Sequence, residues 1–258
     1  MQLGSVDRSS DRSPSKQIAD DLRLLITSGS LPPGERIPSE AALIEHYGVA
    51  RMTVRQALQE LRGEGLVFAE HGKGVFVQRK APVRRLASDR FARRHREQGK
   101  AAFLAEAEKA GAQASVDRIR VEEREPSAEI RERLRIDAGE LVVVRSRRYL
   151  ADGIPVETAV SYIPAEIARG TAISERDTGP GGIYARLEEA GHTLDHFVEE
   201  VTARMPSNEE RDALQLGASV PIMRVVRTAF DTAGMAVEVC DTIKAAPSYV
   251  LEYDFPAR

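Results

Sequence analysis

The stretch from Pro38 to Val77 constrains the fold of this chain more than any other part. It contains two short amphipathic segments, 39–47 and 51–64, that meet at Gly48. Two strand-like segments, 66–69 and 75–77, then flank the turn His71-Gly72-Lys73-Gly74. Apolar residues at helical spacing followed by a glycine-rich hairpin predict two helices and a wing. This order is typical of a winged helix-turn-helix, which places its second helix in the DNA major groove.

A third helix is predicted ahead of this stretch, over residues 15–28. Ile18, Leu22, Leu25 and Ile26 form one apolar stripe at helical spacing, and Gly29 follows as a stop signal. The turn Leu31-Pro32-Pro33-Gly34 then redirects the chain, because the two prolines fix φ and cannot donate hydrogen bonds. We therefore expect a DNA-binding domain over residues 15–80, preceded by a flexible tail over residues 1–14.

The candidate DNA contacts lie at the start of the second helix and at the tip of the hairpin. Arginine can pair bidentately with guanine, and threonine can contact a phosphate or a thymine methyl. A lysine at the tip of a hairpin can meet a phosphate. Taken singly, these residues are also what a solvated helix face and an ordinary hairpin contain, so their order along the chain carries the prediction. The predicted contacts are Ser39, Arg51, Met52, Thr53, Arg55, His71, Gly72 and Lys73.

Four motifs resemble the DNA-binding domain of the GntR family of transcription regulators. They are QIA at 17–19, SGxLPPGERxPSE at 28–40, VxRMTVRQAL at 49–58 and GKGxFV at 72–77. The resemblance implies operator contacts at Arg51, Thr53 and Arg55, and a wing that uses His71 and Gly72. The chain departs from the family pattern at two positions. Ala41 replaces an arginine that usually contacts DNA, and Ala50 replaces a serine or threonine that usually caps the recognition helix.

The distribution of charge agrees with a DNA-binding front and a different back. Residues 1–100 carry a net charge of +6, whereas residues 101–258 carry −9. The stretch 81–100 alone has seven Lys or Arg residues, and we expect residues 81–92 to be a basic linker. This linker could contact DNA phosphates or be a solvated connector.

Other sequence properties predict a cytoplasmic protein without membrane association. No apolar run approaches the roughly 20 residues that span a bilayer. The N-terminus has no apolar signal segment. Cys240 is the single cysteine, which excludes an internal disulfide.

Beyond the linker, strand-like segments alternate with short helical ones and predict an α+β domain over residues 93–258. The dipeptide Asp152-Gly153 predicts a tight hairpin, and the turn 231–234 predicts a longer one. Hairpins between neighbouring strands imply an antiparallel sheet. Predicted strands are 116–124, 140–150, 155–163, 197–205, 221–230, 235–244 and 250–255, and predicted helices are 127–135, 182–190 and 207–216.

This second domain resembles the UTRA domain of HutC-type GntR regulators, which has a chorismate-lyase-like fold and binds a small effector. The resemblance rests on RxR at 145–147, DGxPVE at 152–157, IP at 163–164, GIY at 182–184, ExxGH at 188–192 and GxxVE at 234–238. It implies effector contacts at Arg145, Arg147, Glu157, Tyr184 and Glu238. Two departures from sugar-phosphate-binding relatives are Gly182, which replaces a phosphate-binding serine, and the run 244–249. Two arginines would suit an anionic effector.

The sequence predicts no catalytic residue, no cofactor and no metal. His192 and His196 stand four residues apart, but this spacing matches no known metal signature. We therefore expect a homodimeric, effector-responsive regulator, with repression favoured, that binds palindromic operator DNA. Two alternatives remain at this point: a lyase-like enzyme that uses the fold of the second domain, and an architectural protein that binds DNA without sequence preference.

Overall fold

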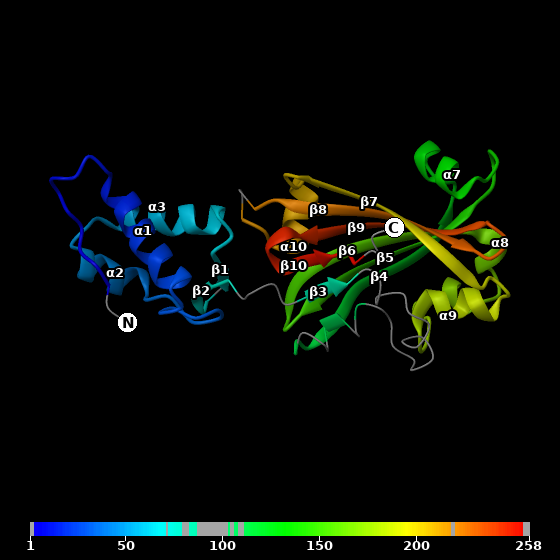
Figure 1. Cartoon of the computed structure of the whole chain (residues 1–258), viewed down its shortest axis with the longest axis horizontal. Coiled ribbons are helices and arrows are strands. Elements are labelled where there is room, and N and C mark those ends of the chain that lie inside the picture. Colours follow the sequence, from blue (N-terminus) through cyan, green and yellow to red (C-terminus); the bar gives the residue numbers. More distant parts are fainter. Residues whose placement is uncertain are drawn as a thin grey trace. The chain divides into compact units, whose positions relative to one another are not determined.

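In the computed structural model the chain forms two compact units (Figure 1). The structure describes residues 3–70, 72–78, 83–86, 103, 106–107, 111–217 and 220–254. The first unit comprises Met1–Lys80 together with Leu216–Val220, and the second comprises Ala81–Gln215 and Pro221–Arg258.

The first unit is a winged helix-turn-helix, as predicted. Helices α1 (Pro14–Thr27), α2 (Glu40–Tyr47) and α3 (Arg51–Gly63) precede the antiparallel hairpin of β1 (Val67–Glu70) and β2 (Gly74–Val77). The predicted stripes meet in one apolar core, in which Ile18, Leu22, Leu58 and Leu61 are buried. Gly48 takes a left-handed conformation, with φ of 62°, at the end of α2. This conformation suits glycine and lets the chain turn directly into α3.

Residues 3–13, expected as a flexible tail, form an arm that lies against the helices of this unit. Leu3 and Val6 pack against the apolar core. The side-chain amide of Gln17 donates to the carbonyls of Asp7 and Arg12 at 2.9 and 2.8 Å, and its oxygen accepts from the Asp7 N–H at 2.9 Å. The polar composition of the arm predicted none of these contacts.

The second unit has an antiparallel sheet of order β4-β5-β6-β9-β8-β7, which confirms the predicted α+β class. Its strands are β4 (Ala114–Arg124), β5 (Val142–Ala151), β6 (Ile154–Pro164), β7 (Leu194–Arg204), β8 (Ile222–Asp231) and β9 (Ala236–Ala245). Helix α7 (Ala128–Leu134) packs Ile130 and Leu134 on one face of the sheet, against Val142, Val144 and Val226. Helices α8 (Ala165–Ala168) and α9 (Gly182–Glu189), with the 3-10 turn η1 (Ala172–Ser174), cover the other face.

Helix α10 and strand β10 complete the second unit. Helix α10 (Asn208–Leu214) begins with a capping box, in which Ser207 and Glu210 each bond the other's backbone N–H. The 3-10 turn η2 (Ala246–Ser248) leads into β10 (Tyr249–Glu252).

The segment expected as a basic linker contains a strand. Residues Val83–Leu86 form β3, which pairs in parallel with β10 (Figure 1). The Arg85 side chain is only 1% exposed and forms an ion pair with Glu199 on β7. Arg85 is therefore neither a solvated residue nor a residue placed to touch DNA.

No helix among the described residues is long and apolar enough to cross a membrane.

Candidate functional sites

The first candidate site is the start of α3 in the winged-helix unit. Arg51 and Met52 are each 70% exposed, although neighbouring Val54 and Ala57 are fully buried. Apolar residues on the inner face of α3 thus fix the helix, and its first turn points long side chains into solvent. This is the arrangement that a recognition helix requires.

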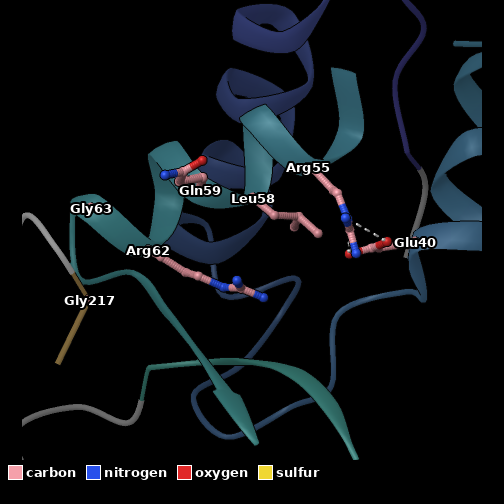
Figure 2. A pocket seen from close by; sticks show the side chains of 7 residues that line it. All are labelled: Glu40, Arg55, Leu58, Gln59, Arg62, Gly63 and Gly217. Atoms are coloured by element: carbon pink, nitrogen blue, oxygen red, sulfur yellow. Dashed lines mark hydrogen bonds and ion pairs between the residues drawn. The ribbon is translucent and has the colours of Figure 1, made fainter. Parts of the chain in front are cut away.

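A carboxylate lies between the two arginines of this surface. The Oε2 atom of Glu40, in the first turn of α2, lies 3.5 Å from Nε of Arg51. The same atom lies 3.3 Å from Nε of Arg55 (Figure 2). The two ion pairs hold both guanidinium groups beside the start of α2. Glu40 thus orients both arginine side chains, and each guanidinium keeps further N–H donors for DNA.

The remaining predicted DNA contacts lie on three elements. Ser39 caps α2, and its Oγ accepts the Ala42 N–H at 3.2 Å. Thr53 is half-buried on α3, while Gly72 and Lys73 are exposed in the hairpin turn. Gly72 has a φ of 75°, which a residue with a side chain rarely adopts. His71 lies outside the described residues.

The groove along α3 extends from this surface toward the end of the helix (Figure 2). It has a volume of about 430 Å³, and Arg62 lies at the end of α3 opposite Arg55. Its lining is Glu40, Arg55, Leu58, Gln59, Arg62, Gly63 and Gly217.

The second candidate site is a cavity of about 320 Å³ between the sheet of the second unit and α9. Its lining residues come from β4, β5, β8 and β9, from the loop before α9 and the start of α9, and from Phe103, so the sheet forms its floor. Four arginines and two carboxylates line it, an excess of two positive charges. The lining is Phe103, Val116, Ile119, Arg145, Arg147, Tyr149, Arg176, Asp177, Thr178, Gly179, Gly181, Gly182, Ile183, Tyr184, Arg227 and Glu238.

Arg145 holds the loop that closes one side of this cavity. Its Nη1 donates to the carbonyls of Ile173, at 2.5 Å, and Glu175, and its Nη2 donates to the Arg176 carbonyl at 3.1 Å. Burial, and then the neighbouring charge of Arg147, lowers the Arg145 pKa to about 10. The guanidinium is thus still charged at neutral pH, but most of its donors are already used by the protein.

Arg147 lies two residues along the same strand and therefore on the same face of the sheet. Its Nε donates to the Tyr149 hydroxyl at 2.7 Å, and its Nη1 donates to Ser161 Oγ at 2.9 Å. These bonds orient the guanidinium against the cavity floor.

Arg227, on β8, was not among the predicted residues, yet it links several groups of the cavity. Its Nε donates to the Tyr184 hydroxyl at 2.8 Å. Its Nη2 lies 3.8 Å from Oε2 of Glu238, and its Nη1 lies 3.7 Å from Oε1 of Glu199. Burial raises the Tyr184 pKa well above its ordinary value, so this hydroxyl stays neutral and can donate a hydrogen bond. An arginine inside the largely apolar segment 220–230 was the sequence signal that could have identified this residue.

One oxygen of Glu238 makes no hydrogen bond in the part of the chain that the structure describes, although it lies 3.8 Å from Arg227. The residue is 1% exposed, and its Oε2 has no hydrogen-bond donor among the described residues. A buried acceptor without a donor costs about 1–3 kcal/mol, which a ligand hydroxyl or ammonium group could recover.

The predicted effector residues divide into two groups. Arg145, Arg147, Tyr184 and Glu238 line the cavity together. Glu157 is not part of its lining: it is buried in an ion pair with Lys244 and accepts from the Tyr249 hydroxyl at 2.6 Å. The departure at 244–249 thus supplies a buried partner for Glu157.

The loop before α9 brings backbone to the cavity at the position where the UTRA resemblance implied a serine. Gly179, Gly181 and Gly182 all have positive φ, between 69° and 81°. Helix α9 has no side-chain cap at its N-terminus. Gly182 therefore offers backbone alone to a ligand.

The two histidines have separate partners. His192 Nδ1 lies 2.9 Å from Asp231 Oδ2, and His196 Nδ1 lies 2.8 Å from Asp195 Oδ2. Within the described ranges, no group of three or more His, Cys, Asp or Glu side chains could hold a metal ion.

Comparisons with known proteins match both units to families. Residues 14–77 match the family described as bacterial regulatory proteins, gntR family, and residues 109–249 match the UTRA domain. An uncharacterized HTH-type transcriptional regulator of Streptomyces coelicolor, SCO4628, is 32% identical over 251 residues, which cover 93% of this chain and 91% of that protein.

Two further relatives carry functional names. The histidine utilization repressor of Pseudomonas putida is 30% identical and covers 78% of this chain and 76% of its own. The transcriptional repressor NagR of Bacillus subtilis is 26% identical, with 90% of each chain covered. Among solved structures, a GntR-family transcriptional regulator superposes with a TM-score of 0.60 at 29% identity, over 96% of this chain and 99% of that one.

Proposed function

The chain belongs to the GntR family of bacterial transcription regulators, in the HutC-type group with a UTRA domain, and on this premise we propose how its two sites act. The protein is a homodimeric repressor. Each protomer reads one half of a palindromic operator with α3 and the hairpin, and an anionic effector in the cavity changes operator affinity. The proposal of DNA binding is supported most by the exposed first turn of α3 and by the two arginines that Glu40 orients.

Substitution of the two arginines tests the recognition surface. An operator is first selected from genomic fragments, and its affinity is then measured for Arg51→Ala and Arg55→Ala. We expect each substitution to cost roughly 1–3 kcal/mol of binding free energy where the arginine reads a base. Arg169→Ala is the control, because Arg169 is an exposed arginine of the second unit that is paired with Glu123. Equal affinities for all four proteins would refute this assignment.

The charge balance of the cavity supports an anionic effector. Arg147 on β5 and Arg227 on β8 both line the floor, and the lining has an excess of two positive charges. Arginine binds carboxylate and phosphate groups bidentately, which suits recognition of such a ligand. Glu238 would accept from a hydroxyl or ammonium group of the same ligand.

A screen of metabolites by thermal shift identifies the effector and tests this assignment. We expect carboxylates or phosphates to raise the Tm of the wild-type protein and to lose this effect in Arg227→Gln. Arg169→Gln is the control, since Arg169 is exposed and paired with Glu123. Hits confined to neutral compounds would contradict an anionic effector.

We also propose that the effector is bound and not converted. NMR spectra of an identified ligand, incubated with the protein, are expected to show no product over hours. Turnover would favour the lyase-like alternative, which the fold alone supports only weakly.

A further inference from the structure

The N-terminal arm, residues 3–13, makes specific hydrogen bonds to the helices of the winged-helix unit. The Gly4 N–H donates to Asp21 Oδ2 on α1 at 2.8 Å, and the Gly4 carbonyl lies 2.8 Å from His46 Nε2 on α2. A Cβ added at Gly4 would lie 3.0 Å from Oδ1 of Asp21, so a side chain here would disturb the contact. Together with the hydrogen bonds of Gln17 to Asp7 and Arg12, these bonds fix the arm near both of its ends.

These contacts of the arm place Arg8 beside the turn of the helix-turn-helix. The Nη2 atom of Arg8 donates to the carbonyl of Gly48 at 3.3 Å. Gly48 ends α2 and stands only three residues before Arg51, so the exposed Arg8 side chain lies beside the start of the recognition helix.

Arg8 differs from the other arginines of this surface in its charge environment. Arg12 on the same arm pairs with Asp20 at 2.6 Å, and Arg51 and Arg55 share Glu40. No carboxylate within the described part of the chain pairs with Arg8. One Nη2–H contact to Gly48 also leaves most of the five guanidinium donors available.

We propose that Arg8 of the N-terminal arm is part of the DNA-binding surface and contacts a backbone phosphate of the operator. The inference rests on the proposed insertion of α3 into DNA. The first helix of a helix-turn-helix crosses the DNA backbone, and Arg8 lies at Gly48, where that helix ends. Arg8 adds a cation to a surface in which Ala41 and Ala50 contribute no charge or hydroxyl. We expect a phosphate and not a base as the partner of Arg8. The arm lies beside α3 and does not extend beyond the N-terminal end of that helix, from which base edges would be reached.

The salt dependence of DNA binding tests this inference. Affinity is measured at salt concentrations between about 50 and about 200 mM for the selected operator and for a duplex of scrambled sequence. One phosphate contact contributes about −0.9 to the slope of log affinity against log salt. We expect Arg8→Ala to weaken binding to both duplexes by a similar factor and to make the slope less negative by about 0.9. The wild-type advantage should therefore shrink about 3.5-fold over that fourfold rise in salt.

Two further variants complete the design. Arg8→Lys keeps the charge and should restore most of the slope. Arg12→Ala removes an arginine from the same arm that is already paired with Asp20, and should leave the slope unchanged. The Tm of each variant reports whether the substitution destabilises the packing of the arm on the winged-helix unit.

Several outcomes would overturn the inference. An unchanged slope in Arg8→Ala would exclude a phosphate contact, and a loss confined to the operator would indicate base reading instead. A lower Tm with no rescue by Arg8→Lys would make Arg8 a structural residue only. A wild-type protein that binds no DNA would instead refute the proposed function, so the two failures are distinguishable.

Discussion

At the scale of single residues, the two helix starts of the helix-turn-helix differ in a testable way. Ser39 caps α2 with a side-chain bond, whereas Ala50 stands at the N-cap of α3 and makes none. Ala50 has φ of −67° and ψ of 153°, the extended geometry that a capping serine adopts. We expect Ala50→Ser to raise the free energy of unfolding by about 1 kcal/mol, because it satisfies one free N–H of α3. Urea unfolding of the whole chain measures this change.

Ser39→Ala is the matched comparison for this substitution. It removes the bond to the Ala42 N–H and is expected to cost about 1 kcal/mol. If Ala50→Ser had no effect while Ser39→Ala destabilised the protein, the start of α3 would have another source of stability.

At the scale of elements, Glu199 on β7 connects the effector cavity to β3. It pairs with Arg85 of β3 and lies 3.7 Å from Nη1 of Arg227 in the cavity. Because Arg85 is buried, loss of this carboxylate would weaken the compensation of its charge. We expect Glu199→Gln to speed amide hydrogen exchange in residues 83–86 and 249–252.

Glu200→Gln is the control for this prediction. Glu200 is the next residue of β7, but it lies on the opposite face of the sheet and pairs with the partly exposed Arg133. Faster exchange of β3 in both variants would show that β7 is generally weakened. Unchanged exchange in Glu199→Gln would show that the ion pair does not hold β3.

The elements predicted correctly are those whose signals are local. Helices α2 and α3 follow from apolar spacing around Gly48, and the β5–β6 hairpin follows from Asp152-Gly153. Strand β3 was not predicted, because its partner β10 is far away in the sequence and its basic composition suggested a linker. The cavity shows the same limit. Glu157 and Glu238 lie in similar strand patterns, and only tertiary packing pairs Glu157 with Lys244 while leaving an oxygen of Glu238 unsatisfied.

At the scale of the whole molecule, the proposed homodimer constrains the spacing of its operator. A two-fold symmetric dimer presents the same surface twice, so it binds two half-sites on the same side of the duplex. We therefore expect sedimentation of the free protein to give a mass of twice 28.4 kDa. A monomeric mass at micromolar concentration would contradict the homodimer.

The helical repeat of DNA gives a stricter test of two-fold recognition. Insertion of about half a turn, roughly 5 base pairs, between the half-sites moves one of them to the opposite side of the duplex. Insertion of a full turn, about 10 base pairs, restores the side and changes only the distance. Two half-sites read by one dimer should thus lose affinity strongly with the first insertion and recover part of it with the second. Equal affinity for both spacings would mean that each recognition helix binds its half-site independently.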